Sequence, residues 1–202
     1  MRAPDTPGTA LVASRAMSKN KLSGLKDLLG SLPSQGFLEL GAAAVGHGEL
    51  DPKGDLSEKD RKGAEVISAL FECVFLVAAA DGKIADEEAE ELVEVLTDLT
   101  DGKMKEADID AVADACAKKL EREGFAEAIA SAAGRLDDDE LRRIAFVMAT
   151  GVAFVDGTVD PREEALFGAL ADALKLPRDE ALDLLNRVAS AVDEYETENP
   201  RG

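Results

Sequence analysis

The residues best suited to chemistry in this chain are four carboxylates at matching positions of a repeated pattern. The pattern is Asp-Gly-x-(Ile/Val)-x-x-x-Glu, and its two copies begin 75 positions apart, at Asp81 and at Asp156. Each copy ends on a glutamate, which is Glu88 in the first copy and Glu163 in the second. Carboxylate oxygens are preferred ligands of hard divalent cations such as calcium, magnesium and manganese. The repeat therefore raises the hypothesis of a divalent-cation site formed by these four residues.

Each copy matches only the second half of an EF-hand calcium loop. In that loop the ligands fall at positions 1, 3, 5, 7, 9 and 12, with glycine at position 6. If the aspartate takes position 5, the glycine falls at position 6 and the glutamate at position 12 in both copies. Positions 1 and 3 are then apolar: they are Val77 and Ala79 in one copy and Val152 and Phe154 in the other. Each copy is therefore half a site, and a complete site needs the two copies to converge about a pseudo-twofold axis.

Local helix chemistry offers a second interpretation of the same residues. Gly82 and Gly157 can be helix stop signals, and the aspartates before them can be solvated turn residues. Glu163 can complete a capping box at the start of a helix. Capping does not require the same aspartate and glutamate in both copies, so the repeat favours the metal interpretation while the capping one stays open.

The elements that must position these carboxylates are predicted to be helices. Ala, Leu, Glu and Asp dominate the chain, Trp is absent and there is one Tyr, a composition that favours helix over sheet. Nearly continuous apolar runs predict central helices over 64–80 and about 138–155, each leading into one copy of the pattern. The copies also agree upstream, where Phe71 corresponds to Phe146. We predict an all-α fold, a single domain of about seven helices built from two pseudo-symmetric helical hairpin repeats.

The other helices follow from apolar spacing and from Gly and Pro breaks. We expect one over about 86–100, two within 103–134, one starting at Asp160-Pro161, and a last one over about 178–192. In the last helix the side chains predicted to face inward are Leu182, Leu185 and Val188. The chain then divides into an N-terminal extension or linker over 1–59, which can carry one amphipathic helix, a helical domain over 60–195, and a tail over 196–202.

The net charge of −19 is concentrated in the predicted domain. Residues 1–60 hold 7 basic and 8 acidic side chains, so nearly all the excess negative charge lies on residues 61–202. A field of this sign repels nucleic acid and anionic lipid, and it attracts cations and basic protein surfaces. We therefore expect no nucleic-acid partner. No apolar run is long enough to span a membrane and no secretory signal is visible, so we expect no transmembrane segment and a cytoplasmic location.

The remaining reactive residue types do not assemble into a catalytic motif. Cys73 and Cys116 lie in apolar helical stretches without ligand-spaced partners, which predicts buried free thiols. The only histidine, His47, lies in a Gly-rich loop. Paired carboxylates can act as acid and base, but nothing indicates a nucleophile, an oxyanion hole or a phosphate loop. We expect a protein that is not an enzyme.

The two copies, read with the residues before them, resemble a known family. The first copy reads Ala78-Ala79-Ala80-Asp81-Gly82-x-Ile84 with Glu88, and the second reads Gly151-Val152-Ala153-Phe154-Val155-Asp156-Gly157-x-Val159-Asp160 with Glu163. This pair resembles the two signatures of the tellurite-resistance TerB family, whose domain type is similar to the N-terminal domain of the DjlA co-chaperones. The resemblance covers about residues 60–195. Residues 1–59 extend beyond it and leave an added anchoring or docking role open.

The resemblance implies an all-helical fold of two related halves in a cytoplasmic protein linked to tellurite and other chemical stress. It also implies that the paired acids bind a divalent metal ion, and it carries this role onto Asp81, Glu88, Asp156 and Glu163. The leading hypothesis is a TerB-like module that binds such an ion and scaffolds other stress-response proteins, some of them membrane-associated. The alternative is an acidic protein–protein interaction module of the co-chaperone type that binds no metal.

Overall fold

A computed structural model of the chain describes residues 58–79, 106–156 and 161–197, with residues 25, 27–29, 31, 92, 93, 96 and 97. Six helices have defined bounds: α3 (Glu58–Ala78), α5 (Glu106–Glu123), α6 (Phe125–Ala133), α7 (Asp139–Asp156), α8 (Pro161–Ala173) and α9 (Arg178–Thr197). Residues 25, 27–29, 92, 93, 96 and 97 are also helical. No strand occurs in the described part of the chain, so the all-α prediction is confirmed. None of the described helices is long and apolar enough to cross a membrane.

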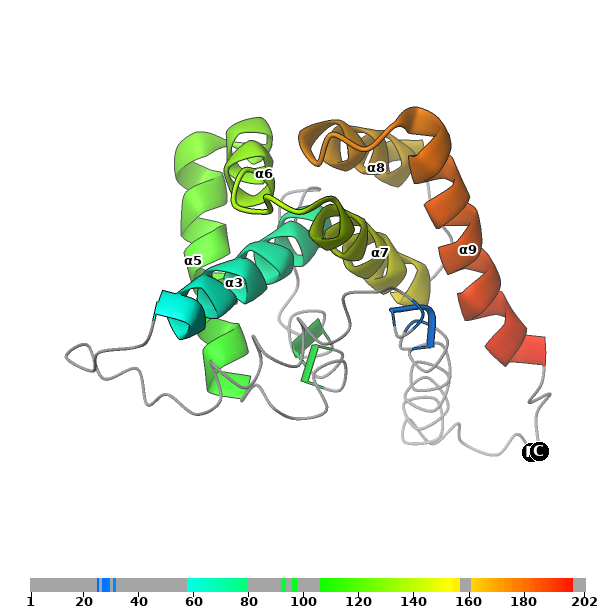
Figure 1. The fold of residues 1–202 in the computed structure, drawn as a ribbon, viewed down its shortest axis with the longest axis horizontal. Helices are drawn as coiled ribbons and strands as arrows, with labels where there is room; N and C mark the ends of the chain where they lie inside the picture. Colours follow the sequence, from blue (N-terminus) through cyan, green and yellow to red (C-terminus); the bar gives the residue numbers. More distant parts are fainter. Residues whose placement is uncertain are drawn as a thin grey trace, which may run out of the picture.

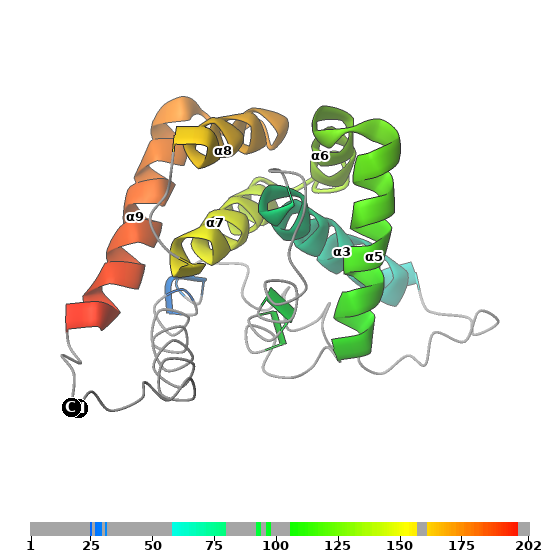
Figure 2. The ribbon, with the colours of Figure 1, turned by 180° about the vertical axis from the view of Figure 1, so that it is seen from behind.

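Two central helices, α3 and α7, pack against each other, and each is covered by a further pair of helices. The pair α5 and α6 covers α3, while α8 and α9 cover α7 (Figure 1). Seen from behind, α3 and α7 again lie in the middle with one helix pair on each side (Figure 2). Contacts of α8 with α3 and with α6 join the two groups. The pseudo-twofold relation between the repeats stays a prediction, because the first corner lies outside the described residues.

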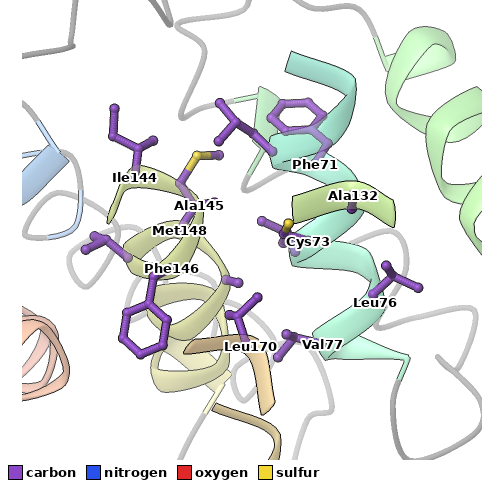
Figure 3. Close-up of a cluster of buried hydrophobic side chains, with 14 of the residues drawn as sticks. Phe71, Cys73, Leu76, Val77, Ala132, Ile144, Ala145, Phe146, Met148 and Leu170 are labelled. Carbon is purple, nitrogen blue, oxygen red and sulfur yellow. The ribbon is translucent and has the colours of Figure 1, made fainter. Parts of the chain in front are cut away.

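The core is built from equivalent positions of the two repeats. Phe71 on α3 and its counterpart Phe146 on α7 are both fully buried (Figure 3). The pairs Val77–Val152 and Leu92–Phe167 are likewise buried at both members. The apolar residues predicted to make the first helix central are all buried: Ile67, Leu70, Phe71, Val74, Phe75, Leu76 and Val77. The periodicity of the sequence therefore identified the central helix and its core correctly.

The predicted orientation of α9 was wrong at one residue. Leu182 was expected to face inward, but 53% of it is exposed, and Leu184 is buried instead. The inward stripe of α9 runs through Ala181, Leu184 and Val188, which have helical spacing just as 182, 185 and 188 do. Periodicity alone could not choose between two stripes that share Val188, and the packing of α9 on α7 decided it.

Side chains and backbone groups mark where these helices begin and end. The Asp138 carboxylate accepts hydrogen bonds from the backbone N–H groups of Glu140, at 2.7 Å, and Leu141, at 3.4 Å, and so caps α7. After α8 the chain turns at Lys175, whose φ of 58° is left-handed, and the Leu176 N–H donates to the Ala171 carbonyl at 2.9 Å. This turn reverses the chain, so that α9 packs along α7.

The described residues before α3 belong to the same core. Leu25 and Leu29 are buried, and Leu25 lies against Gly151 in the last half of α7. A Cβ atom at position 151 would lie 2.4 Å from Leu25 Cδ1, which is far inside van der Waals contact. The absence of a side chain at Gly151 therefore lets Leu25 reach α7. On the α9 side, Arg187 Nη2 donates to Ser31 Oγ at 3.5 Å.

Candidate functional site

The four predicted metal ligands follow the two central helices in the sequence. In the second corner, Asp156 is the last residue of α7 and Glu163 is the third residue of α8. Asp81 and Glu88 of the first corner lie outside the described residues. Among the described side chains no group of three or more His, Cys, Asp or Glu could hold a metal ion. Convergence of the four carboxylates therefore stays a prediction.

The helices on either side of the second corner contact each other. The rings of Phe154 on α7 and Phe167 on α8 stack with centroids 6.2 Å apart. Pro161 is the first residue of α8, a position where its missing N–H has no cost and its fixed φ suits the helix. The stack packs the last turns of α7 against the middle of α8, and only four residues separate the two helices, so Asp156 and Glu163 flank the same corner.

A second charged cluster, which sequence reasoning missed, joins α3, α5 and the turn after α6. Lys119 Nζ lies 3.0 Å from Glu72 Oε2 and also donates to Ser131 Oγ at 2.9 Å. Arg135 Nη2 lies 2.5 Å from the same Glu72 oxygen. Only 13% of the Glu72 side chain and 16% of the Lys119 side chain are exposed. The signal was visible in the sequence, because Glu72 is the only charged residue between Glu65 and Asp81.

The electrostatics of this cluster suit a structural role. Burial by itself would raise the pKa of the Glu72 carboxyl, but the contacts and positive charges of Arg135 and Lys119 outweigh burial and lower it. Glu72 is therefore ionised at neutral pH and already bound by two cations. Such a carboxylate is a weak base and offers little to a metal ion. The cluster instead ties α5 and the end of α6 to α3.

The two cysteines next to this cluster are free and buried, as predicted. Burial, with the negative charge of Glu72 as the next cause, raises the pKa of Cys73 and of Cys116 to about 12. The thiolate is the reactive form of cysteine, so neither thiol is activated as a nucleophile or metal ligand at neutral pH.

We expect both thiols to resist alkylation in the folded protein. With iodoacetamide at pH 8, labelling of Cys73 and Cys116 should be roughly 1000-fold slower than in the urea-unfolded chain, because both thiolate formation and access are suppressed. Mass spectrometry of the alkylated protein over time measures this ratio. Rapid uptake of one label by the folded protein would show that one thiol is exposed or ionised.

Comparison with known proteins identifies the domain. A sequence model of the family described as "Tellurite resistance protein TerB" matches residues 67–186. The match begins in α3, ends in α9 and includes both copies of the acidic pattern. Searches of curated proteins and of solved structures found no match to this chain. Since the matched residues make up more than half of its length, the chain belongs to the TerB family of tellurite resistance proteins.

Proposed function

We propose that this chain is a non-enzymatic TerB-family module that binds a divalent metal ion and scaffolds partner proteins in a cytoplasmic response to tellurite and related chemical stress. The ion is calcium, magnesium or manganese, and its ligands come from Asp81, Glu88, Asp156 and Glu163. The supporting observation is the duplication of the acidic pattern within the family match, each copy following one of two central helices with equivalent buried positions.

The charge distribution explains why a cation would be needed. Four carboxylates that converge repel one another, and a bound divalent ion would offset that repulsion while linking the corners. Linking the corners would also join the two halves of the domain, because one corner follows α3 and the other involves α7 and α8. The ion would then stabilise the surface on which partners assemble.

We expect calcium to bind the wild-type protein and not an Asp81→Ala/Asp156→Ala variant, because the variant loses one ligand from each corner. Isothermal titration calorimetry on apo protein, with magnesium and manganese as parallel titrants, gives the affinity and the preferred ion. At a free calcium concentration 100 times the Kd, binding should stabilise the wild-type fold by about 2.7 kcal/mol and raise its Tm.

The matched control is an Asp110→Ala/Asp183→Ala variant, which removes two exposed aspartates on α5 and α9. It has the same net charge as the test variant and should bind calcium like the wild type. Equal binding heats for the wild type and the Asp81→Ala/Asp156→Ala variant would refute the metal site.

A second candidate function is an acidic interaction module without metal, favoured by the net charge of −19. In that case the carboxylates meet a basic partner surface directly. This function predicts a Tm that does not respond to calcium or EDTA and partner binding that weakens as salt is raised.

A further inference from the structure

A groove of about 520 Å³ is lined mainly by residues of α8 and α9. Phe146 of α7 and Phe167 of α8, both buried, line its inner part. Most of the remaining lining is also apolar, and Leu182 lies at the edge with 53% of it exposed. Leu182 is the one large apolar side chain that the described residues leave mostly exposed. The groove therefore combines an aromatic floor with an apolar side chain that faces solvent.

The α8 wall of the groove opens at a glycine. Glu164, Gly168 and Asp172 line the groove at positions i, i+4 and i+8, so they form one row along α8. A Cβ atom at Gly168 would meet nothing within 4 Å, so no neighbouring group requires a glycine there. Glycine is also among the least favourable residues inside a helix. What a glycine does offer at this position is room for another backbone to approach α8 closely.

The charges along this row favour a ligand that carries positive charge. Glu164 and Asp172 are both exposed, and eight residues of helix separate them by about 12 Å. Neither forms an ion pair with another described residue that would neutralise it. Arg178 is the only basic residue that lines the groove in the described part of the chain, so two acids face one base. The groove thus presents two negative charges, one on each side of the open position.

We propose that this groove binds an amphipathic helix of a partner protein. The apolar stripe of that helix enters between α8 and α9 and covers Leu182, and its backbone passes close to Gly168. Two lysine or arginine side chains, two helical turns apart, face Glu164 and Asp172. A helix can carry two cations at a two-turn spacing together with an apolar stripe at i, i+3 and i+4, so it matches both the paired acids and the apolar lining of the groove. The proposal goes beyond the function proposed above, because none of the four predicted metal ligands lines the groove.

The test uses the full-length protein in EDTA, so that its outcome is independent of metal binding. The probe is an acetylated, amidated peptide of leucine and lysine with its leucines on one helical face, and the reference is a scrambled peptide of the same composition. Fluorescence anisotropy gives both Kd values. Gly168→Leu fills the open position and should weaken binding of the amphipathic peptide at least tenfold. Ala169→Leu adds the same side chain at an exposed neighbour outside the groove and should leave the Kd unchanged.

Two further variants keep the proposal open to refutation if Gly168→Leu misfolds. Leu182→Asp should raise the Kd of the amphipathic peptide at least tenfold. Glu164→Gln/Asp172→Asn should weaken binding of the amphipathic peptide and make its Kd less dependent on salt. The control Asp110→Asn/Asp183→Asn has the same charge change and should alter neither the Kd nor its salt dependence. Equal binding of both peptides, or equal Kd values for Gly168→Leu and Ala169→Leu, would overturn the proposal. Self-association that Gly168→Leu abolishes, without peptide binding, would also overturn it by assigning the groove to a second copy.

Discussion

A Leu25→Ala variant is expected to lose about 2–5 kcal/mol of the free energy of unfolding, although Leu25 lies more than 40 residues before the matched family domain. Leu25 is fully buried, and its methyl groups fill the space that Gly151 leaves open on α7. Truncation removes these contacts and leaves a cavity inside the core. Urea unfolding followed by far-UV circular dichroism measures the change, with Leu182→Ala, which truncates a mostly exposed leucine, as the control.

Because of the same contact, Gly151→Ala should destabilise the wild-type protein but stabilise the Leu25→Ala variant. In the wild type, Gly151→Ala places a Cβ against Leu25 and should destabilise the fold. Overpacking costs about 1–3 kcal/mol, which exceeds the free energy gained from the higher helix propensity of alanine. In the Leu25→Ala background the space is free, so Gly151→Ala should stabilise the fold by roughly 1 kcal/mol. Two results together would show that the residues around Leu25 fold independently of α7. The two substitutions would change the free energy of unfolding additively, and Leu25→Ala alone would lower it by less than about 0.5 kcal/mol.

The second large effect is expected at Glu72. Glu72→Gln keeps the shape of the side chain but leaves Lys119 and Arg135 without their shared anion. The free energy of unfolding should fall by about 2–3 kcal/mol, which is less than the roughly 3–5 kcal/mol for breaking a fully buried pair, because the cluster is partly exposed. Glu65→Gln on the same helix is the control, since Glu65 meets Arg61 at 3.8 Å with both side chains mostly exposed, and it should cost less than about 0.5 kcal/mol. A loss at Glu72 no larger than at Glu65 would contradict this account.

The contribution of Glu72 also has a defined pH dependence. Its pKa is lower in the folded protein than the value of 4.5 for an unperturbed carboxyl, so the unfolded chain binds more protons in the acidic range. The stabilisation is therefore fully present above pH 4.5 and is lost as the pH falls through the folded pKa. The difference in stability between wild type and Glu72→Gln should be large at pH 7 and should shrink at pH 3. The same difference at both pH values would mean that the effect comes from packing and not from charge.

Helical periodicity was sufficient to predict the fold class and the core of the first central helix. The residues predicted to be buried around Phe71 are buried, because a helix that is apolar on nearly every face has no surface it can leave in water. The match between Phe71 and Phe146 likewise predicted two central helices, and both residues are fully buried, Phe71 on α3 and Phe146 on α7 (Figure 3). The family also followed from sequence, because the paired acidic pattern and the residues before it are local signals.

Contacts between residues far apart in the chain could not be predicted from the sequence. Two stripes of α9 had the same helical spacing, and only its packing on α7 left Leu182 outside and created an apolar groove edge. The partners of Glu72 come from positions 47 and 63 residues away, and Leu25 meets a glycine more than 120 residues later.

The sequence by itself thus determined that this protein is helical, belongs to the TerB family and carries the acidic pattern twice, because helix propensity, apolar spacing and a short motif act over neighbouring residues. Only the tertiary structure decided which side chains pair, which leucine stays in water and where α7 admits Leu25. Those outcomes depend on how whole helices approach one another, and no local pattern records that.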